Sequence, residues 1–445
     1  MIDSAKNVTV GGATSGIVSA SYIIYDDSGT IKAVNGTTGV VDYSGSDASV
    51  VIQDAINALT SGGKIFIKNG TYDISNTITL RDYITIEGES LWDGTVLKLI
   101  NNVNRDMFYL SPKADPSQYS HIRLCNFKID GNNANNTLGS GINFGSMRKL
   151  RLEKLEIRNC GESGIKFPSV GNGNSVSHEC IFYDLYIYDC NDIGINLSSF
   201  NDSKLINVYC QQNGSHGLIL YSSNNTLFHV HCYDNANRGI VINGDNCALI
   251  NCWGDTNDEH GIEIKSAYCQ LVNCFSFNNG ASATNTYSGI NLNGATFTRV
   301  IGCHLSESGT KQKYGISEIG SADSNVIMGN TFSGNITGPI NKSGYHTVIK
   351  DNIGYRTESN IVSEKFAIYS TGIKILKIIH DLNIIPNVQD CCLTVIQDTI
   401  VDDWAYNLLK IVSTDAIYIT AKINVSMASK TKGATAKLGL KIVIS

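Results

Sequence analysis

The 445-residue chain contains few prolines and few charged residues. Only five prolines occur, and charged residues make up 17% of the chain, below the roughly 25% usual for soluble domains. Proline lacks a backbone donor, so its scarcity favours a chain built mostly from hydrogen-bonded inner strands. The net charge of −6 lacks the basic excess that phosphate backbones require, and we expect no nucleic-acid partner.

Several common functional and targeting signals are also missing. No apolar run approaches the roughly 18 residues of a membrane span, and Met1–Lys6 does not lead into the apolar segment of a signal peptide. We therefore expect a soluble chain without membrane insertion or a cleaved signal. The Gly-x-Ser-x-Gly elbow, the phosphate-binding glycine loop and His-Glu-x-x-His are absent, so esterase, nucleotide and zinc-protease functions have no motif behind them.

What the chain does contain is a repeat. A Gly-Ile or Gly-Leu dipeptide followed by alternating apolar residues recurs roughly every 22 to 30 residues, a period typical of solenoids, with its glycines at Gly141, Gly164, Gly194, Gly217, Gly239, Gly261, Gly289 and Gly315. The residues one and three places after each glycine are mostly apolar and are expected to face a core. The residue between them is predicted to face solvent, at Asn143, Lys166, Asn196, Ile219, Val241, Glu263, Asn291 and Ser317.

A second pattern runs in phase with the first. It places a cysteine at one position per repeat, at Cys210, Cys232, Cys252, Cys274 and Cys303. Two strand families in phase predict an all-β, parallel β-helix, because an antiparallel sandwich would not keep residue identity at a fixed spacing. The cysteines are predicted to form one internal ladder of buried thiols. Their odd total and the lack of a Cys-x-x-Cys pair favour neither a disulfide framework nor zinc.

The regions flanking the repeat differ from it. Residues 1–42 are predicted to hold a β-hairpin, and residues 47–60 an amphipathic helix that covers the open end of the first coil. The β-helix itself is expected over 43–355. After it, 356–445 show alternating apolar residues without the coil period, which predicts an antiparallel β-sandwich.

Residues 43–355 resemble a known superfamily. The order Ile-Gln-x-Ala-Ile (52–56), Gly-Gly-Lys-Ile-Phe-Ile (62–67), Gly-Thr-Tyr (70–72), Ile-Glu-Gly (86–88) and Ile-Asp-Gly-Asn (129–132) is similar to that of pectate-lyase-like right-handed β-helices, including phage tailspike depolymerases. Asn69 replaces the proline usual before Gly-Thr-Tyr. The resemblance implies a polysaccharide ligand, a homotrimer, a virion-tail or extracellular location, and a trimerisation or carbohydrate-binding role for 356–445.

Outward acids and histidines are the candidate catalytic groups. His216, Arg238 and His260 each precede a repeat glycine in three successive coils, so they are predicted to stack. Carboxylates one or two coils apart would be separated by about 5 or 10 Å, which brackets the distances that glycosidases use. We therefore predict catalytic residues among Asp255, Asp258, Glu259, His260 and His216, and substrate contacts from Arg238, Asp234, Glu263, Lys265, His231 and Tyr209.

Three functions stay open at this stage. The first is a tailspike-like depolymerase that hydrolyses glycosidic bonds without a cofactor. The second is a lyase that performs β-elimination on a uronic-acid polymer, for which Ca²⁺ or a basic side chain would neutralise the substrate carboxylate. The third is a glycan-binding adhesin or fibre without catalysis. The spacing around Asp255–Lys265 faintly resembles that of polygalacturonases, but Asp255 and Asp258 are not adjacent and Glu263-Ile-Lys265 replaces the family's Arg-Ile-Lys.

Overall fold

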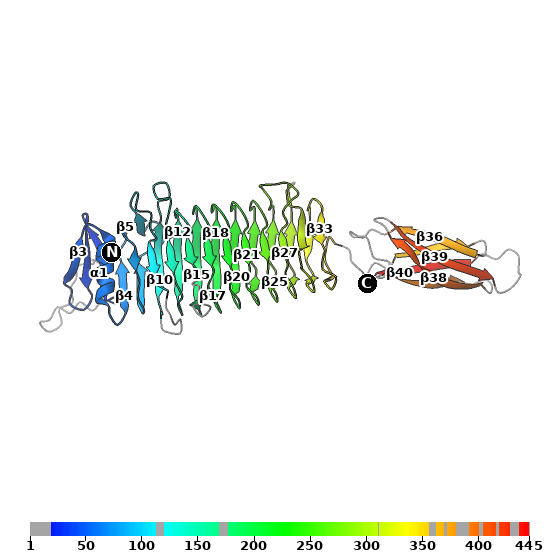
Figure 1. Cartoon of the computed structure of the whole chain (residues 1–445), viewed down its shortest axis with the longest axis horizontal. Helices are drawn as coiled ribbons and strands as arrows, with labels where there is room; N and C mark the ends of the chain where they lie inside the picture. Colours follow the sequence, from blue (N-terminus) through cyan, green and yellow to red (C-terminus); the bar gives the residue numbers. More distant parts are fainter. Residues whose placement is uncertain are drawn as a thin grey trace, which may run out of the picture.

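The chain forms a right-handed parallel β-solenoid of about 11 turns (Figure 1). The computed structural model describes residues 19–112, 120–168, 177–309 and 311–355, together with the backbone of six strands between 362 and 444. No helix in these described parts is long and apolar enough to cross a membrane.

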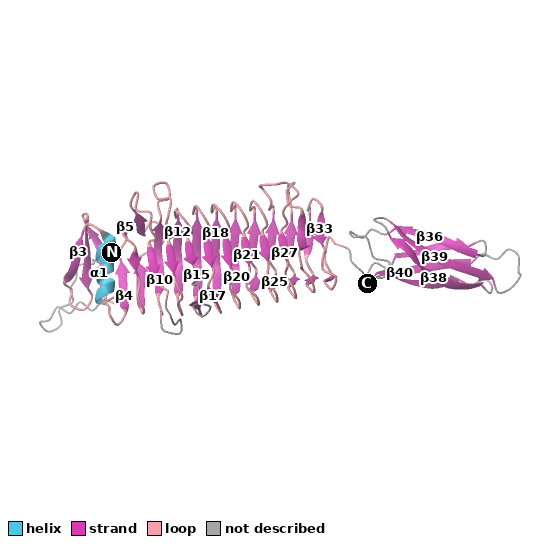
Figure 2. Ribbon diagram, in the orientation of Figure 1, coloured by secondary structure: helices cyan, strands magenta, loops and turns pink. Residues whose placement is uncertain are grey.

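The N-terminal strands extend the solenoid sheet. Strands β1 (Tyr22–Asp27), β2 (Thr30–Asn35) and β3 (Val41–Gly45) pair antiparallel, which confirms the predicted hairpin, and β1 pairs in parallel with β4 (Gly63–Ile67) of the first coil. Helix α1 (Ala48–Ala58) begins after Asp47, whose side chain accepts the Ser49 amide. Figure 2 shows the helix between these strands and the first coils. Its apolar face is buried in the common core, whereas the capping role stays a prediction.

The repeat glycines lead into one sheet, here called the glycine sheet. Its eleven strands stack in parallel: β6 (Ile78–Thr79), β9 (Phe108–Leu110), β11 (Ile142–Phe144), β13 (Ile165–Phe167), β16 (Ile195–Leu197), β19 (Leu218–Leu220), β21 (Ile240–Ile242), β24 (Ile262–Ile264), β27 (Ile290–Asn293), β30 (Tyr314–Ile319) and β33 (Gly338–Asn341). Register pairs Leu218 with Ile240 and Ile240 with Ile262, so the preceding glycines lie above one another, as predicted.

These glycines are required because the coils approach closely. A Cβ added at Gly217 would lie 2.8 Å from the carbonyl oxygen of Gly239, and one at Gly239 would lie 2.5 Å from that of Gly261. Both distances are too short for a real Cβ contact. The column therefore selects glycine for space between neighbouring backbones.

The rest of each coil bends once. Early coils contain β5 (Gly70–Ile74), β7 (Ile84–Gly88) and β8 (Thr95–Leu99), and five later ones use single long strands: β10 (Arg123–Asp130), β12 (Arg151–Arg158), β15 (Ile181–Tyr188), β18 (Lys204–Gln211) and β20 (Thr226–Tyr233). The last coils use shorter strands: β22 (Ala248–Ile250), β23 (Trp253–Asp255), β25 (Gln270–Val272), β26 (Phe275–Phe277), β28 (Arg299–Ile301), β29 (His304–Ser306), β31 (Val326–Met328), β32 (Thr331–Ser333) and β34 (Val348–Lys350).

One residue per coil makes this bend with a positive φ. Asn207, His229, Asn251 and Asn273 have φ between 51° and 55° and align from coil to coil. The strand register after this corner shows that the predicted alignment of the cysteines is wrong. Cys210 pairs with Cys232, but Cys232 pairs with Gly254, so Cys252, Cys274 and Cys303 form a separate column two residues away. The eleven described cysteines are all buried and free.

A second ladder lies inside the turns that precede the glycine sheet. The ladder consists of Asn213, Asn235, Asn257, Asn279 and Gln312, one from each successive coil. The side-chain amide of each asparagine donates to the side-chain oxygen of the next member, at 3.0 to 3.2 Å. All five side chains are buried. The sequence carries this signal as an asparagine four residues before Gly217, Gly239 and Gly261, which our sequence analysis missed.

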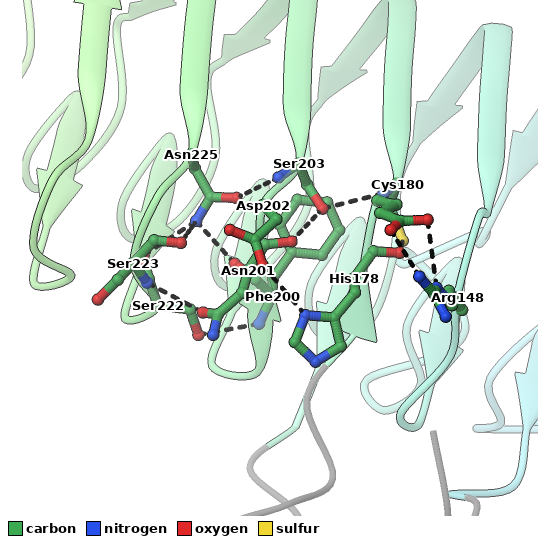
Figure 3. A network of polar contacts seen from close by, with 11 residues as sticks. Arg148, His178, Cys180, Phe200, Asn201, Asp202, Ser203, Ser222, Ser223 and Asn225 are labelled. Atoms are coloured by element: carbon green, nitrogen blue, oxygen red, sulfur yellow. Dashed lines mark hydrogen bonds and ion pairs between the residues drawn. The ribbon is translucent and has the colours of Figure 1, made fainter. Parts of the chain in front are cut away.

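A comparable network closes the turns around the short strands β14 (Ser177–His178) and β17 (Phe200–Asn201), shown in Figure 3. Asn225 Nδ2 donates to the Phe200 carbonyl at 2.7 Å, and its Oδ1 accepts the Ser203 amide at 3.0 Å. The buried backbone amides of these turns are thus hydrogen-bonded to side chains, which keeps neighbouring coils stacked there.

Six further strands follow the solenoid in sequence. They pair antiparallel in two three-stranded sheets, one of β35 (Val362–Ile368), β40 (Ala436–Ile444) and β37 (Cys391–Thr399), the other of β36 (Gly372–Ile379), β39 (Tyr418–Met427) and β38 (Trp404–Thr414). Antiparallel pairing agrees with the sequence expectation. The sandwich packing and the role of this region stay predictions. Adjacent cysteines in a strand point to opposite faces, so Cys391 and Cys392 are not expected to form a redox pair, and their side chains lie outside the described residues.

Candidate functional site

A column of aromatic rings follows the solenoid on the strands after the corner. Register places its members at the same position of successive coils, and this set is called the aromatic column: Tyr186, Tyr209, His231, Trp253, Phe275 and His304. Neighbouring ring centroids lie 4.5 to 6.1 Å apart. All six side chains are half-buried. With coils about 4.8 Å apart, the column presents roughly 24 Å of continuous ring surface.

A histidine–aspartate pair lies at the centre of this column. His231 Nε2 is 2.6 Å from Asp255 Oδ1, one coil further on. Because the carboxylate accepts the Nε2 proton, Nδ1 is the ring nitrogen left with a lone pair. Tyr233 lies two residues after His231 with its ring centroid 4.5 Å away. Burial, together with Asp234 and Asp255, raises the pKa of Tyr233, so its hydroxyl is a proton donor at neutral pH.

A second group of polar residues lies at the glycine sheet and is called the ionic cluster: His216, Arg238, Glu259, His260, Glu263 and Lys265. Arg238 binds two carboxylates at once, with Nε 2.8 Å from Glu259 and an Nη 2.8 Å from Glu263. Lys265 Nζ lies 3.3 Å from Glu263. The positive charges of Arg238 and Lys265 therefore neutralise the negative charges of the two glutamates.

Glu263 is almost fully buried in this cluster, although its position was predicted to face solvent. Asn291 and Asn293 donate to its Oε1 at 3.0 and 3.2 Å. Burial raises its pKa, but Arg238, the Asn293 hydrogen bond and Lys265 outweigh that effect and hold the pKa below its usual value. Ile219 and Val241 at the equivalent positions are also buried, together with Ile193. The outer face of the glycine sheet is therefore covered by its own side chains here.

The two histidines of the ionic cluster are hydrogen-bonded to the next coil. His216 Nδ1 accepts the Arg238 amide at 3.1 Å, and His260 Nδ1 accepts the Ser288 amide at 2.9 Å. Burial and the Arg238 charge lower the pKa of His216 to about 4. Burial likewise lowers the pKa of His260 to about 4, against the opposing charge of Glu263. Both rings are neutral at physiological pH, and their occupied Nδ1 atoms make them poor bases.

The predicted site residues therefore divide between two surfaces. His231, Tyr209 and Asp255 meet at the aromatic column, while His216, Arg238, Glu259, His260, Glu263 and Lys265 meet at the ionic cluster. The stacking of His216, Arg238 and His260 is confirmed, because the Gly217 amide donates to the Arg238 carbonyl and the Gly239 amide to the His260 carbonyl. Asp234 and Asp258 lie in turns, where Asp234 is exposed.

Four residues of the aromatic column were not singled out from the sequence: Tyr186, Trp253, Phe275 and His304. Their common signal is a ring two residues after a positive-φ corner residue, and the mistaken alignment of the cysteines obscured it. Trp253 is the clearest example, because strand pairing aligns it with His231, whereas matching Cys252 with Cys232 would have set it against Tyr233.

A calcium ion does not fit the ionic cluster. The oxygens of Glu263 already contact Arg238, Lys265 and the two asparagine amides, which leaves no cluster of free anionic oxygens for a hard cation. Within the described residues, no group of three or more His, Cys, Asp or Glu side chains is arranged to hold a metal ion.

Comparison with known families agrees with the fold. Residues 37–241 match the family model described as rhamnogalacturonase A/epimerase, pectate lyase-like. This confirms the pectate-lyase-like resemblance predicted from the sequence. No protein of curated function matches the chain in sequence.

Solved structures with the same fold include enzymes and phage proteins. The A-module of mannuronan C-5 epimerase AlgE4 from Azotobacter vinelandii is 20% identical, with a TM-score of 0.55 over 68% of this chain and 96% of that one. The enzymatically active domain of tailspike protein 2 of bacteriophage CBA120 is 14% identical, with a TM-score of 0.55 over 90% and 74%. ORF18 of Geobacillus virus E2 is 17% identical, with a TM-score of 0.50 over 88% and 72%. At identities of 14 to 20%, these similarities establish the shared β-helix fold.

Proposed function

We propose that the chain is a tailspike-like polysaccharide depolymerase whose substrate lies along the aromatic column, and that it cleaves a uronic-acid polymer by β-elimination at His231. The observation that carries the proposal is the His231–Asp255 pair in the middle of a continuous row of rings. The apolar faces of sugar rings stack on aromatic side chains, and a row in register with the coils suits an extended polymer.

The proposed reaction needs one base and one acid. His231 Nδ1 removes the proton at C5 of the uronic acid, the electron pair forms the C4–C5 double bond, and the C4–O bond breaks. Tyr233, whose raised pKa keeps the hydroxyl protonated at neutral pH, donates that proton to the leaving oxygen. Asp255 holds the imidazole and stabilises its charge after proton transfer. Gln211, in register with Tyr233 one coil earlier, supplies an amide donor for the substrate carboxylate.

Hydrolysis is the second candidate. A glycosidase requires two carboxyl groups on either side of the scissile bond. Around His231, the outward residues of the adjoining coils are Tyr209, Gln211, Trp253 and Asp255, which provide one carboxyl group. The ionic cluster does hold two, because Glu259 and Glu263 share Arg238. Hydrolysis is therefore expected to depend on Glu259, which is the more exposed of the pair.

Digestion of a polysaccharide panel separates these functions. β-Elimination yields unsaturated products that absorb in the ultraviolet, hydrolysis yields reducing ends without that absorbance, and a non-catalytic fibre yields neither while still binding glycan. His231→Ala is expected to lower kcat by about 10²- to 10⁴-fold, as for loss of a general base. Tyr233→Phe should also lower kcat, whereas Glu259→Gln should leave it unchanged.

His229→Asn provides the matched control. His229 is an exposed histidine at the corner of the same strand, with φ 54°, a conformation that asparagine tolerates well. Full activity in this variant would show that loss in His231→Ala is specific. Unchanged activity in His231→Ala, combined with loss in Glu259→Gln, would overturn the β-elimination proposal in favour of hydrolysis at the ionic cluster.

The assembly and location follow from the same proposal. Similarity to phage tailspike domains supports attachment to a virion tail and a homotrimer. Sedimentation analysis is then expected to give about three times the chain mass of 48.2 kDa.

A further inference from the structure

The aromatic column continues into a buried polar site at its N-terminal end. Glu156 is in register with Tyr186, and Lys128 with Glu156. Both side chains are almost fully buried, and Lys128 Nζ lies 3.2 Å from Glu156 Oε1. The Tyr188 hydroxyl donates to the same oxygen. The other carboxylate oxygen, Oε2, is buried without a hydrogen-bond partner.

A short loop, Glu89–Gly94, lies over this end of the column. The Trp92 ring centroid is 5.2 Å from that of Tyr186, and Asp93 Oδ1 is 2.7 Å from Lys128 Nζ. Trp92 has φ 63°, a left-handed conformation that is strained for a bulky side chain. Asp93 is 94% exposed, so this ion pair holds the loop weakly.

These observations concern different atoms but meet at one place. A carboxylate oxygen buried without a donor is unfavourable. A sugar hydroxyl is a neutral donor that would satisfy Glu156 Oε2 and would leave the Lys128 and Tyr188 contacts intact. The neighbouring rings of Trp92 and Tyr186 offer the faces on which that sugar would stack.

We propose that Trp92, Tyr186 and Glu156 form a terminal sugar-binding subsite of the aromatic column, which opens when the Glu89–Gly94 loop moves and Glu156 Oε2 accepts a hydroxyl of the bound sugar. The inference rests on the proposed function, since it extends the same glycan track. It assigns the end of the track to these residues, two or more coils away from the cleavage point at His231. The subsite therefore affects binding and product length rather than the chemical step.

The test uses the full chain with oligosaccharides of defined length from alginate, polygalacturonate and dextran. For the oligosaccharide that wild type binds, Glu156→Gln and Trp92→Ala are expected to weaken binding by roughly 10- to 100-fold, the loss of one hydrogen bond to a charged group. This loss should appear with long oligosaccharides and be absent with short ones. Because Glu156 is buried, Trp92→Ala serves as the variant that keeps the core intact, and thermal melting verifies folding of both.

Tyr268→Ala is the matched control. Tyr268 is an exposed ring that stacks on Phe297, with centroids 5.2 Å apart, away from the column. If the enzyme cleaves its polysaccharide and Trp92→Ala and Glu156→Gln bind long oligosaccharides as wild type does, the subsite is wrong and the proposed function stands. If wild type binds and cleaves nothing in the panel, both proposals are overturned.

Discussion

At the scale of the residue, environment decides what each histidine does. His231 is partly exposed and pairs through Nε2 with Asp255, which leaves Nδ1 to react. His216 and His260 instead accept backbone amides through Nδ1 and are held neutral. The same residue type is thus the proposed base at the aromatic column and a structural acceptor in the ionic cluster.

The buried histidines predict how stability depends on pH. Each has a pKa of about 4 in the folded chain and about 6.5 when unfolded. Between these values the unfolded chain binds protons that the folded chain does not, so the free energy of unfolding falls as the pH drops from about 6.5 toward 4. Urea titrations across this range measure the slope.

His260→Asn should reduce that slope, because the asparagine oxygen can still accept the Ser288 amide but does not titrate. His229→Asn removes an exposed histidine and should leave the slope unchanged. An identical slope in wild type and His260→Asn would contradict the neutral, buried assignment of His260.

At the scale of the element, the glycine column sets how closely the coils can stack. Gly239→Ala would place a Cβ 2.5 Å from the Gly261 carbonyl oxygen and 2.7 Å from Asn257 Nδ2. Overpacking of this kind costs about 1–3 kcal/mol, and the asparagine ladder would shift with it. Chemical denaturation is expected to show a lower free energy of unfolding for this variant.

Gly338→Ala is the control for that experiment. Gly338 also lies in a glycine-sheet strand, but a Cβ there meets nothing within 4 Å and its φ is not left-handed. Its effect should stay within about 0.5 kcal/mol. Equal stability losses at the two positions would show that close coil contact is not the reason for the glycine column.

At the scale of the whole molecule, coil stacking turns single side chains into a continuous aromatic surface. The rings from Tyr186 to His304 span five coil spacings, or about 24 Å. The affinity for oligosaccharides is therefore expected to rise with chain length until the glycan covers that distance, and then to level off. Calorimetric titration with a length series measures this, and an affinity independent of length would contradict a track along the column.

The sequence by itself determined the solenoid, because glycine spacing and alternating apolar residues report the coil period directly. It also determined that His216, Arg238 and His260 stack, since they hold fixed places before successive glycines. Only the tertiary structure decided which side chains share a surface. Across the left-handed corner at His229 and Asn251 the coils keep one register, so Trp253 lies beside His231 and Asp255 beside Tyr233. The cysteine pattern predicted a different alignment, because Cys232 and Cys252 are both buried thiols but occupy different positions of the coil. Residue type reports that a side chain is buried, whereas its place in the coil is decided by the strand pairing.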